Sequence, residues 1–160
     1  MKRLAAVVVM MVVATMVFAE SPRLDPDVAR ETDEFTGETS ISASWGVMVD
    51  GDTVIVRAVT TGGTVSFTTG VFSEDLHSTE TLRWIIDEER YSFDIVTYEF
   101  ELRDNSEFAS YAVFDITPLV DTLLDASDVR WRLDGAHNIE DTMTDAELEA
   151  LREVLHAAKE

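Results

Sequence analysis

The stretch that decides the fold is residues 98–133, which read YEFELRDNSEFASYAVFDITPLVDTLLDASDVRWRL. Apolar side chains alternate with charged ones over residues 98–102, are nearly continuous over 108–116, and alternate again over 129–133. Alternation with a period of two is typical of a strand that buries one face. A threonine and a proline precede residues 119–126, whose leucines and valine can form one buried side, which predicts a helix of about two turns. The stretch therefore predicts a strand, a hairpin loop, a second strand, a short helix and a third strand.

The short helix leaves the strand pairing open. About eleven residues separate the two strands that flank it, which is near the minimum for a parallel crossover. An antiparallel return on the far side of the sheet is the alternative.

Upstream of this stretch, the sequence predicts a three-stranded meander. Apolar positions alternate over residues 41–49, and Asp50-Gly51 then forms a strong turn signal. Residues 53–61 and 65–67 are rich in β-branched and aromatic side chains and are separated by a glycine pair. A further strand is predicted over residues 82–86.

The apolar pattern changes phase between two of the predicted strands. Apolar residues occupy odd positions from 91 to 95 and even positions from 96 to 102. A strand cannot exchange its two faces without an extra residue, so a bulge or bend is expected near residues 95–97. We expect the chain to leave one sheet and enter another at this point.

The end of the chain predicts a helix that runs to about Ala158. Thr144 and Glu147 have the spacing of a capping box, and leucines recur on one face downstream. The whole pattern predicts a β-rich α+β fold: a mostly antiparallel sandwich or strongly bent sheet of about eight strands, with a short crossover helix and a carboxy-terminal amphipathic helix.

The first residues have the composition of a signal peptide. Lys2 and Arg3 precede an apolar run of about fifteen residues, and Val17-Phe18-Ala19 resembles a cleavage site. A retained membrane anchor is the alternative, but the run is shorter than the roughly twenty residues that cross a bilayer. We expect residues 1–19 to be removed and the chain to be exported, to a periplasm or the medium, without stable membrane insertion.

Residues 20–40 are expected to form an acidic, flexible leader in which Asp25-Pro26 starts one short helix. Residues 41–160 are expected to form one globular domain.

Charge and cysteine content exclude several functions. Without Lys2 and Arg3, the 12 basic residues fall to 10 against 32 acidic ones, a formal charge of −22. Such a surface repels phosphate backbones, so nucleic acid is not an expected partner. The chain has no cysteine, which excludes thiol catalysis and iron–sulfur chemistry.

Two arginines and a histidine are the candidates for ligand binding. Arg130 and Arg132 project from one face of the same predicted strand, which would suit a carboxylate or another anion. The simpler interpretation is cross-strand pairing with Glu99 and Glu101. His137 lies in the loop that follows.

Asp134, Glu140 and Asp141 form the densest acidic group near that loop and are the candidates for metal binding. Calcium is the ion that such oxygen ligands would suit, although no EF-hand-like loop is present. Solvated acidic loops are the simpler interpretation, and no other cofactor is expected.

No sequence motif for catalysis is present, and no residue is predicted to be catalytic. In particular, the chain has no Gly-x-Ser-x-Gly sequence. We therefore expect a non-catalytic binding or interaction module with a protein partner or a small ligand. A small exported hydrolase that uses carboxylates or His137 is one alternative. A structural or assembly accessory of the cell envelope, docking by edge strands or by the last helix, is the other.

Overall fold

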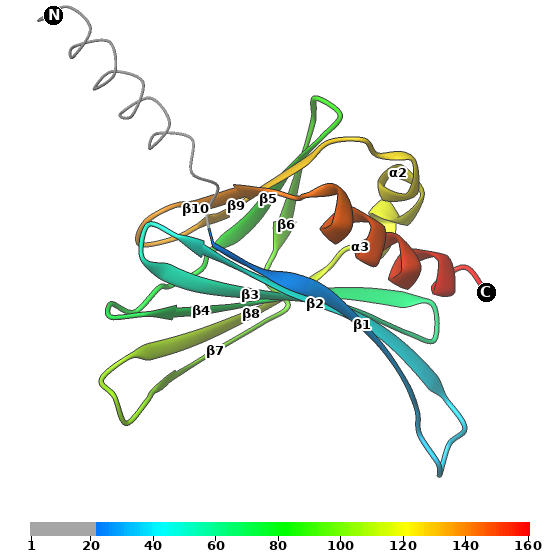
Figure 1. Ribbon diagram of the computed structural model, residues 1–160, viewed down its shortest axis with the longest axis horizontal. Coiled ribbons are helices and arrows are strands. Elements are labelled where there is room, and N and C mark those ends of the chain that lie inside the picture. The colour runs from blue at the N-terminus through cyan, green and yellow to red at the C-terminus, as the bar shows by residue number, and fades with distance from the viewer. Residues whose placement is uncertain (1–21) are drawn as a thin grey trace, which may run out of the picture.

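A computed structural model describes residues 22–160, so the predicted signal peptide lies outside the described residues. The fold contains two antiparallel sheets and three helical segments (Figure 1). The first sheet has the strand order β1-β2-β3-β4-β8-β7 and consists of β1 (Arg23–Thr32), β2 (Thr39–Val49), β3 (Asp52–Thr61), β4 (Thr64–Ser73), β8 (Phe108–Asp115) and β7 (Thr97–Leu102). The second has the order β10-β9-β5-β6 and consists of β10 (Ile139–Thr142), β9 (Val129–Asp134), β5 (Thr81–Ile86) and β6 (Glu89–Asp94). The helical segments are η1 (Thr117–Leu119), α2 (Val120–Asp125) and α3 (Asp145–Ala157).

This architecture confirms the predicted fold class. The meander is formed by β2, β3 and β4, which pair antiparallel in sequence order. One hydrophobic core joins both sheets and α3. At its centre the ring of Phe67 on β4 lies edge-to-face with Trp45 on β2, at 6.3 Å between centroids, and with Trp84 on β5, at 4.9 Å. The contact between Phe67 and Trp84 joins the two sheets, whereas Phe67 and Trp45 belong to the same sheet.

The phase change in the sequence marks the point where the chain changes sheet, as predicted. β6 ends at Asp94 in the four-stranded sheet, and β7 begins at Thr97 in the six-stranded sheet. The amide of Val96 already donates to the carbonyl of Val113 on β8, 2.8 Å away. The shift from odd to even apolar positions therefore turns one buried face toward each sheet.

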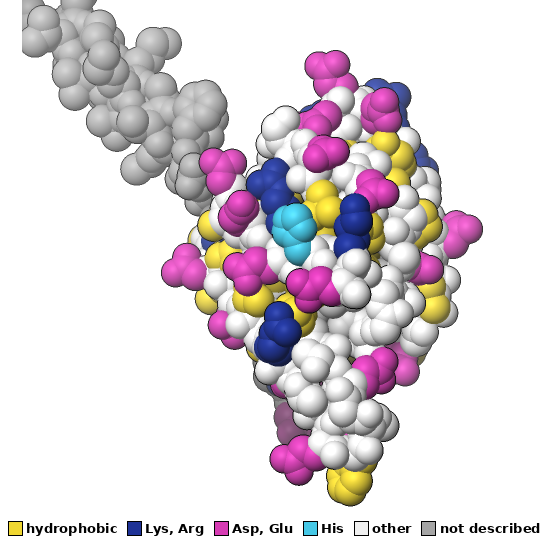
Figure 2. All heavy atoms as spheres, turned by 90° about the vertical axis from the view of Figure 1, so that its right-hand side faces the viewer, with side chains coloured by type: hydrophobic (Ala, Val, Ile, Leu, Met, Phe, Trp, Pro, Cys, Tyr) yellow, Lys and Arg dark blue, Asp and Glu magenta, His cyan; other side chains and the backbone are white. Residues whose placement is uncertain are grey.

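The prediction of a flexible leader is wrong for most of its length. Arg23–Thr32 form β1, which pairs antiparallel with β2, and Asp25-Pro26 start no helix. The register shifts between Leu24 and Asp27, where proline has no amide to donate. This irregularity removes the period-two pattern, and β1 is an edge strand with mostly exposed side chains, so its sequence resembles a solvated segment. The β1–β2 hairpin projects from the body at the lower right of Figure 1 and at the bottom of Figure 2.

The segment η1–α2 connects the two sheets instead of crossing over within one. It links β8 of the six-stranded sheet to β9 of the four-stranded sheet, so neither predicted pairing of these strands occurs. Thr117 does not cap the helix; its hydroxyl accepts from the amide of Val65 at 2.9 Å. The last helix, α3, begins with the predicted capping box. The side chain of Thr144 accepts a hydrogen bond from the backbone amide of Glu147, and the side chain of Glu147 accepts one from the backbone amide of Thr144. Within residues 22–160, no helix is both long and apolar enough to span a membrane.

Candidate functional site

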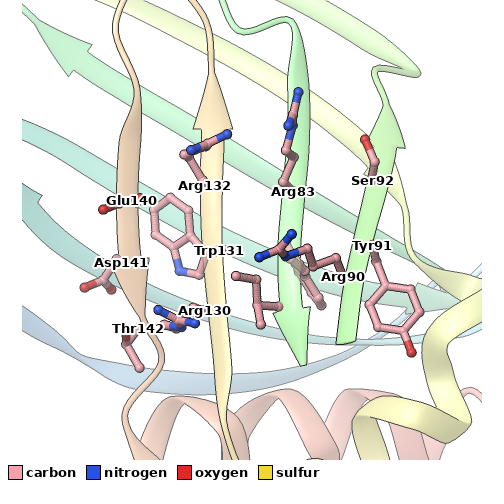
Figure 3. A pocket seen from close by; sticks show the side chains of 12 residues that line it. Arg83, Arg90, Tyr91, Ser92, Arg130, Trp131, Arg132, Glu140, Asp141 and Thr142 are labelled. Carbon is pink, nitrogen blue, oxygen red and sulfur yellow. The ribbon is translucent and has the colours of Figure 1, made fainter. Parts of the chain in front are cut away.

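Four arginines share the outer face of the four-stranded sheet. Arg83 and Arg90 come from β5 and β6, and Arg130 and Arg132 come from β9 (Figure 3). Strand register places them in two rows. In one row Arg130 and Arg90 lie on either side of Ile85, and in the other Arg132 lies directly opposite Arg83. We call these four side chains the arginine face.

The arginine face lines a shallow, open depression of about 980 Å³. Glu140 and Thr142 on β10 close one side of it, and Ser92 on β6 lines the other. The depression faces solvent, since Arg83, Arg90 and Arg130, which line it, are exposed. Trp84 and Trp131 of the same strands are fully buried beneath it.

One pair of arginines is held by a carboxylate. The Nε of Arg83 lies 2.5 Å from Asp134 Oδ2, and the Nε of Arg132 lies 2.7 Å from Asp134 Oδ1. These contacts are ion pairs without well-aligned hydrogen bonds, because Arg132 Nε and Asp134 Oδ2 have no partner of good geometry. Both contacts are made through Nε. The terminal nitrogens of a guanidinium group are further donors that can bind another acceptor.

The other pair has no carboxylate partner. Arg90 and Arg130 are exposed, and neither forms an ion pair with any carboxylate of residues 22–160. Between them lies Ile85, which is half-buried. A guanidinium group presents a fixed fork of donors that matches a carboxylate. The guanidinium groups of Arg90 and Arg130, on either side of an apolar side chain, can therefore bind an anionic group that carries an apolar part.

The predicted pairing of these arginines with β7 is wrong. β9 pairs with β5 and β10, so the cross-strand neighbours of Arg132 are Arg83 and Glu140. Glu99 and Glu101 are on β7 in the other sheet. The alternation of side chains gave the correct face for Arg132, but it carries no information on which strands are neighbours.

His137 lies apart from the arginine face, in the loop between β9 and β10. Its Nε2 is 2.8 Å from Asp52 Oδ2 at the start of β3, beside a small hollow of about 240 Å³. The ring of His77 packs edge-to-face on it, with 4.8 Å between centroids. The structure therefore separates the third ligand candidate from the first two.

His77 is the most buried imidazole of the described chain, with 1% of its surface exposed. Its Nε2 lies 2.9 Å from the carbonyl oxygen of His137, and its Nδ1 lies 3.0 Å from the hydroxyl of Thr79. Burial lowers the pKa of His77 below its ordinary value, and the carbonyl of His137 partly opposes this. The imidazole is thus a neutral structural group that joins two loops.

The three metal candidates do not converge on one point. Asp134 contacts two arginines of the arginine face, whereas Glu140 and Asp141 are neighbours on β10 and point to opposite faces. The carboxylate of Asp141 accepts two hydrogen bonds from the guanidinium group of Arg23, at 2.6 and 2.9 Å. The same arginine also donates to the buried carboxylate of Glu147 at 2.9 Å. Among the residues that the structure describes, no three acidic or histidine side chains are placed to hold a metal ion.

Sequence reasoning missed Arg83 and Arg90. Arg83 alternates with the buried Leu82 and Trp84, and Arg90 precedes the partly buried Tyr91 and Phe93, so the face of each could have been predicted from the period alone. The missing information was the register that places β5 between β6 and β9, which is not local in sequence.

No protein-family model matches the sequence, and no curated protein matches it at a significant level.

Proposed function

We propose that the chain is an exported, non-catalytic binding module whose arginine face receives an anionic ligand. One observation carries the proposal. Four of the ten basic residues after position 3 are on one face of one sheet, in a chain with 32 acidic residues. Basic side chains in so acidic a protein would otherwise be expected to disperse among the carboxylates.

The energetics of the arginine face support an anion as the ligand. Like charges directly opposite each other on a sheet are unfavourable, and Arg83 and Arg132 form such a pair. An added anion would relieve this repulsion and satisfy the free donors of Arg90 and Arg130. Because the depression is open, the ligand would stay partly in water, and salt would weaken its binding.

A hydrolase finds less support in the arrangement of side chains. Catalysis by a nucleophile needs a hydroxyl in reach of a base. Within the described residues no serine hydroxyl hydrogen-bonds to a histidine, and the threonine that does, Thr79, is buried beside His77. The arrangement therefore favours the binding module over a hydrolase.

Citrate, which carries three carboxylates, is a suitable probe for the arginine face. Titration calorimetry on the mature chain should give binding that weakens as sodium chloride is raised. Arg90→Glu combined with Arg130→Glu should abolish it, because both free forks are lost. The matched control is Arg57→Glu with Arg103→Glu, which makes the same change of charge at two exposed arginines outside the arginine face, one on β3 and one in the turn after β7. Absence of binding, or equal loss in the control, would contradict the proposal.

Export has a separate test. The amino-terminal sequence of the protein recovered outside the cytoplasm should begin near Glu20, since Val17-Phe18-Ala19 provides the cleavage site. A chain that keeps Met1 and stays in the cytoplasm would contradict this part of the proposal.

A further inference from the structure

The tip of the β1–β2 hairpin presents an aromatic side chain to solvent. Phe35 is 99% exposed, and it lies in the turn between Thr32, where β1 ends, and Thr39, where β2 begins. We call residues 30–39 the arm. Figure 2 shows a hydrophobic side chain at the lowest point of the arm, with acidic side chains nearby. A large aromatic ring held in water in this way is a common anchor in protein–protein interfaces.

The turn that carries Phe35 is fixed by its own hydrogen bonds. The carboxylate of Asp33 accepts from the amides of Phe35, at 2.7 Å, and Thr36, at 3.0 Å. The backbone of Asp33 also bonds to Gly37, whose φ of 71° suits glycine, and to Glu38. Hydrogen bonds from the amides of Thr36 and Phe35 lower the pKa of Asp33. Because the turn is preorganised, little conformational entropy is lost when it binds.

The charges of the arm are complementary to those of the arginine face. It carries the carboxylates of Glu31, Asp33, Glu34 and Glu38 and one arginine, around an exposed phenyl ring. The arginine face offers two free guanidinium groups around Ile85 in a depression of about 980 Å³. An aromatic ring packs favourably against both an aliphatic side chain and the face of a guanidinium group.

We infer that the arm of one copy of this chain docks on the arginine face of a second copy. Phe35 would lie over Ile85, and the carboxylates of Glu34 and Glu38 would meet Arg90 and Arg130. The inference rests on the proposed function, because it names the occupant of the same anion site. The partner is another copy because the arm and the four-stranded sheet are at opposite ends of the molecule (Figure 1), so the arm cannot reach its own arginine face.

The contact joins two different surfaces, and its repetition therefore leads to open chains of molecules. Each copy keeps one free arm or one free arginine face at an end of the chain. The interface is small and both copies are strongly acidic, so we expect a reversible association that grows with concentration.

Sedimentation velocity of the mature chain, in a concentration series that reaches about 1 mM, tests the inference. The average mass should rise past that of two copies. Phe35→Ser should weaken the association at least tenfold, as should Arg90→Glu with Arg130→Glu. Phe100→Ser on β7, which removes a ring that is 59% exposed, should leave it unchanged.

A mixture of the two defective proteins gives the decisive result. The Phe35 variant keeps its arginine face, and the Arg90 and Arg130 variant keeps its arm. One contact between them is possible, so the mixture should form complexes that stop at two copies. A wild-type chain that stays monomeric, a Phe35 variant that associates as the wild type does, or a mixture that forms no complex would each overturn the inference.

Citrate binding separates the two proposals. Phe35→Ser should bind citrate as the wild type does, because the arginine face is intact. If the wild type binds citrate at Arg90 and Arg130 but does not associate, the inference fails and the proposed function stands. If these arginines affect neither measurement, both fail.

Discussion

Arg83 on β5 lies directly opposite Arg132 on β9, and both guanidinium groups contact the carboxylate of Asp134. Like charges in this position repel each other, and the shared carboxylate offsets the repulsion. Each of its two oxygens contacts the Nε of one arginine. The same carboxylate thus offsets the repulsion between the two arginines and, under the proposed function, would compete with the anionic ligand.

Asp134→Asn should separate these two roles. Loss of the carboxylate leaves the repulsion uncompensated, and the free energy of unfolding should fall by about 1 kcal/mol, since the pair is partly solvated. Citrate affinity should rise roughly fivefold, because the two arginines lose their competitor. Urea unfolding and calorimetry measure the two effects. A variant with lower stability and lower citrate affinity would show that Asp134 only supports the strand.

Arg23 should contribute more to stability than its place near the start of the described chain suggests. It contacts Asp141 and the buried Glu147, and the hydrogen bond to Asp141 raises the pKa of its guanidinium group. Arg23→Met leaves two acids without their cation and should cost about 2–3 kcal/mol in urea unfolding. Adding Asp141→Asn and Glu147→Gln should restore part of the loss. Further destabilisation by these additions would contradict the ion-pair explanation.

The sequence predicted the features of this fold that depend on local pattern. The period of two gave the faces of β2, β5 and β9, the phase change near Ile95 gave the change of sheet, and Thr144 with Glu147 gave the start of α3. These signals need only a few adjacent residues.

The features that it missed depend on distant partners. Arg23 belongs to the fold because of two acids that lie 118 and 124 residues away in sequence. Arg83 joins Arg132 because β5 and β9 are neighbours, which no local pattern specifies. The sequence alone therefore predicted Arg130 and Arg132, whereas Arg83 and Arg90 required the register of the sheet.

Acid should weaken the fold through His77. Its pKa is lowered by burial in the folded chain, so between that value and about 6.5 the unfolded chain binds more protons. The stabilisation is complete above the unfolded pKa and is lost as the pH falls through this window, by at most about 1.4 kcal/mol per pH unit. Urea unfolding from pH 7.5 to 5 should show this slope, and His77→Gln should flatten it. His156→Gln at the exposed end of α3 is the control, and an equal flattening there would contradict the assignment.

Gly135 should tolerate no larger side chain. A Cβ at this position would lie 2.3 Å from the backbone oxygen of Ser78 and 3.1 Å from Cε1 of His77. The backbone must shift to relieve the first contact, so Gly135→Ala should cost about 2–3 kcal/mol in urea unfolding. Gly37→Ala is the control: that site has open space but a positive φ, and it should cost about 1 kcal/mol. If the two variants were destabilised in the reverse order, the close approach of the loops at His77 would not be what requires glycine at position 135.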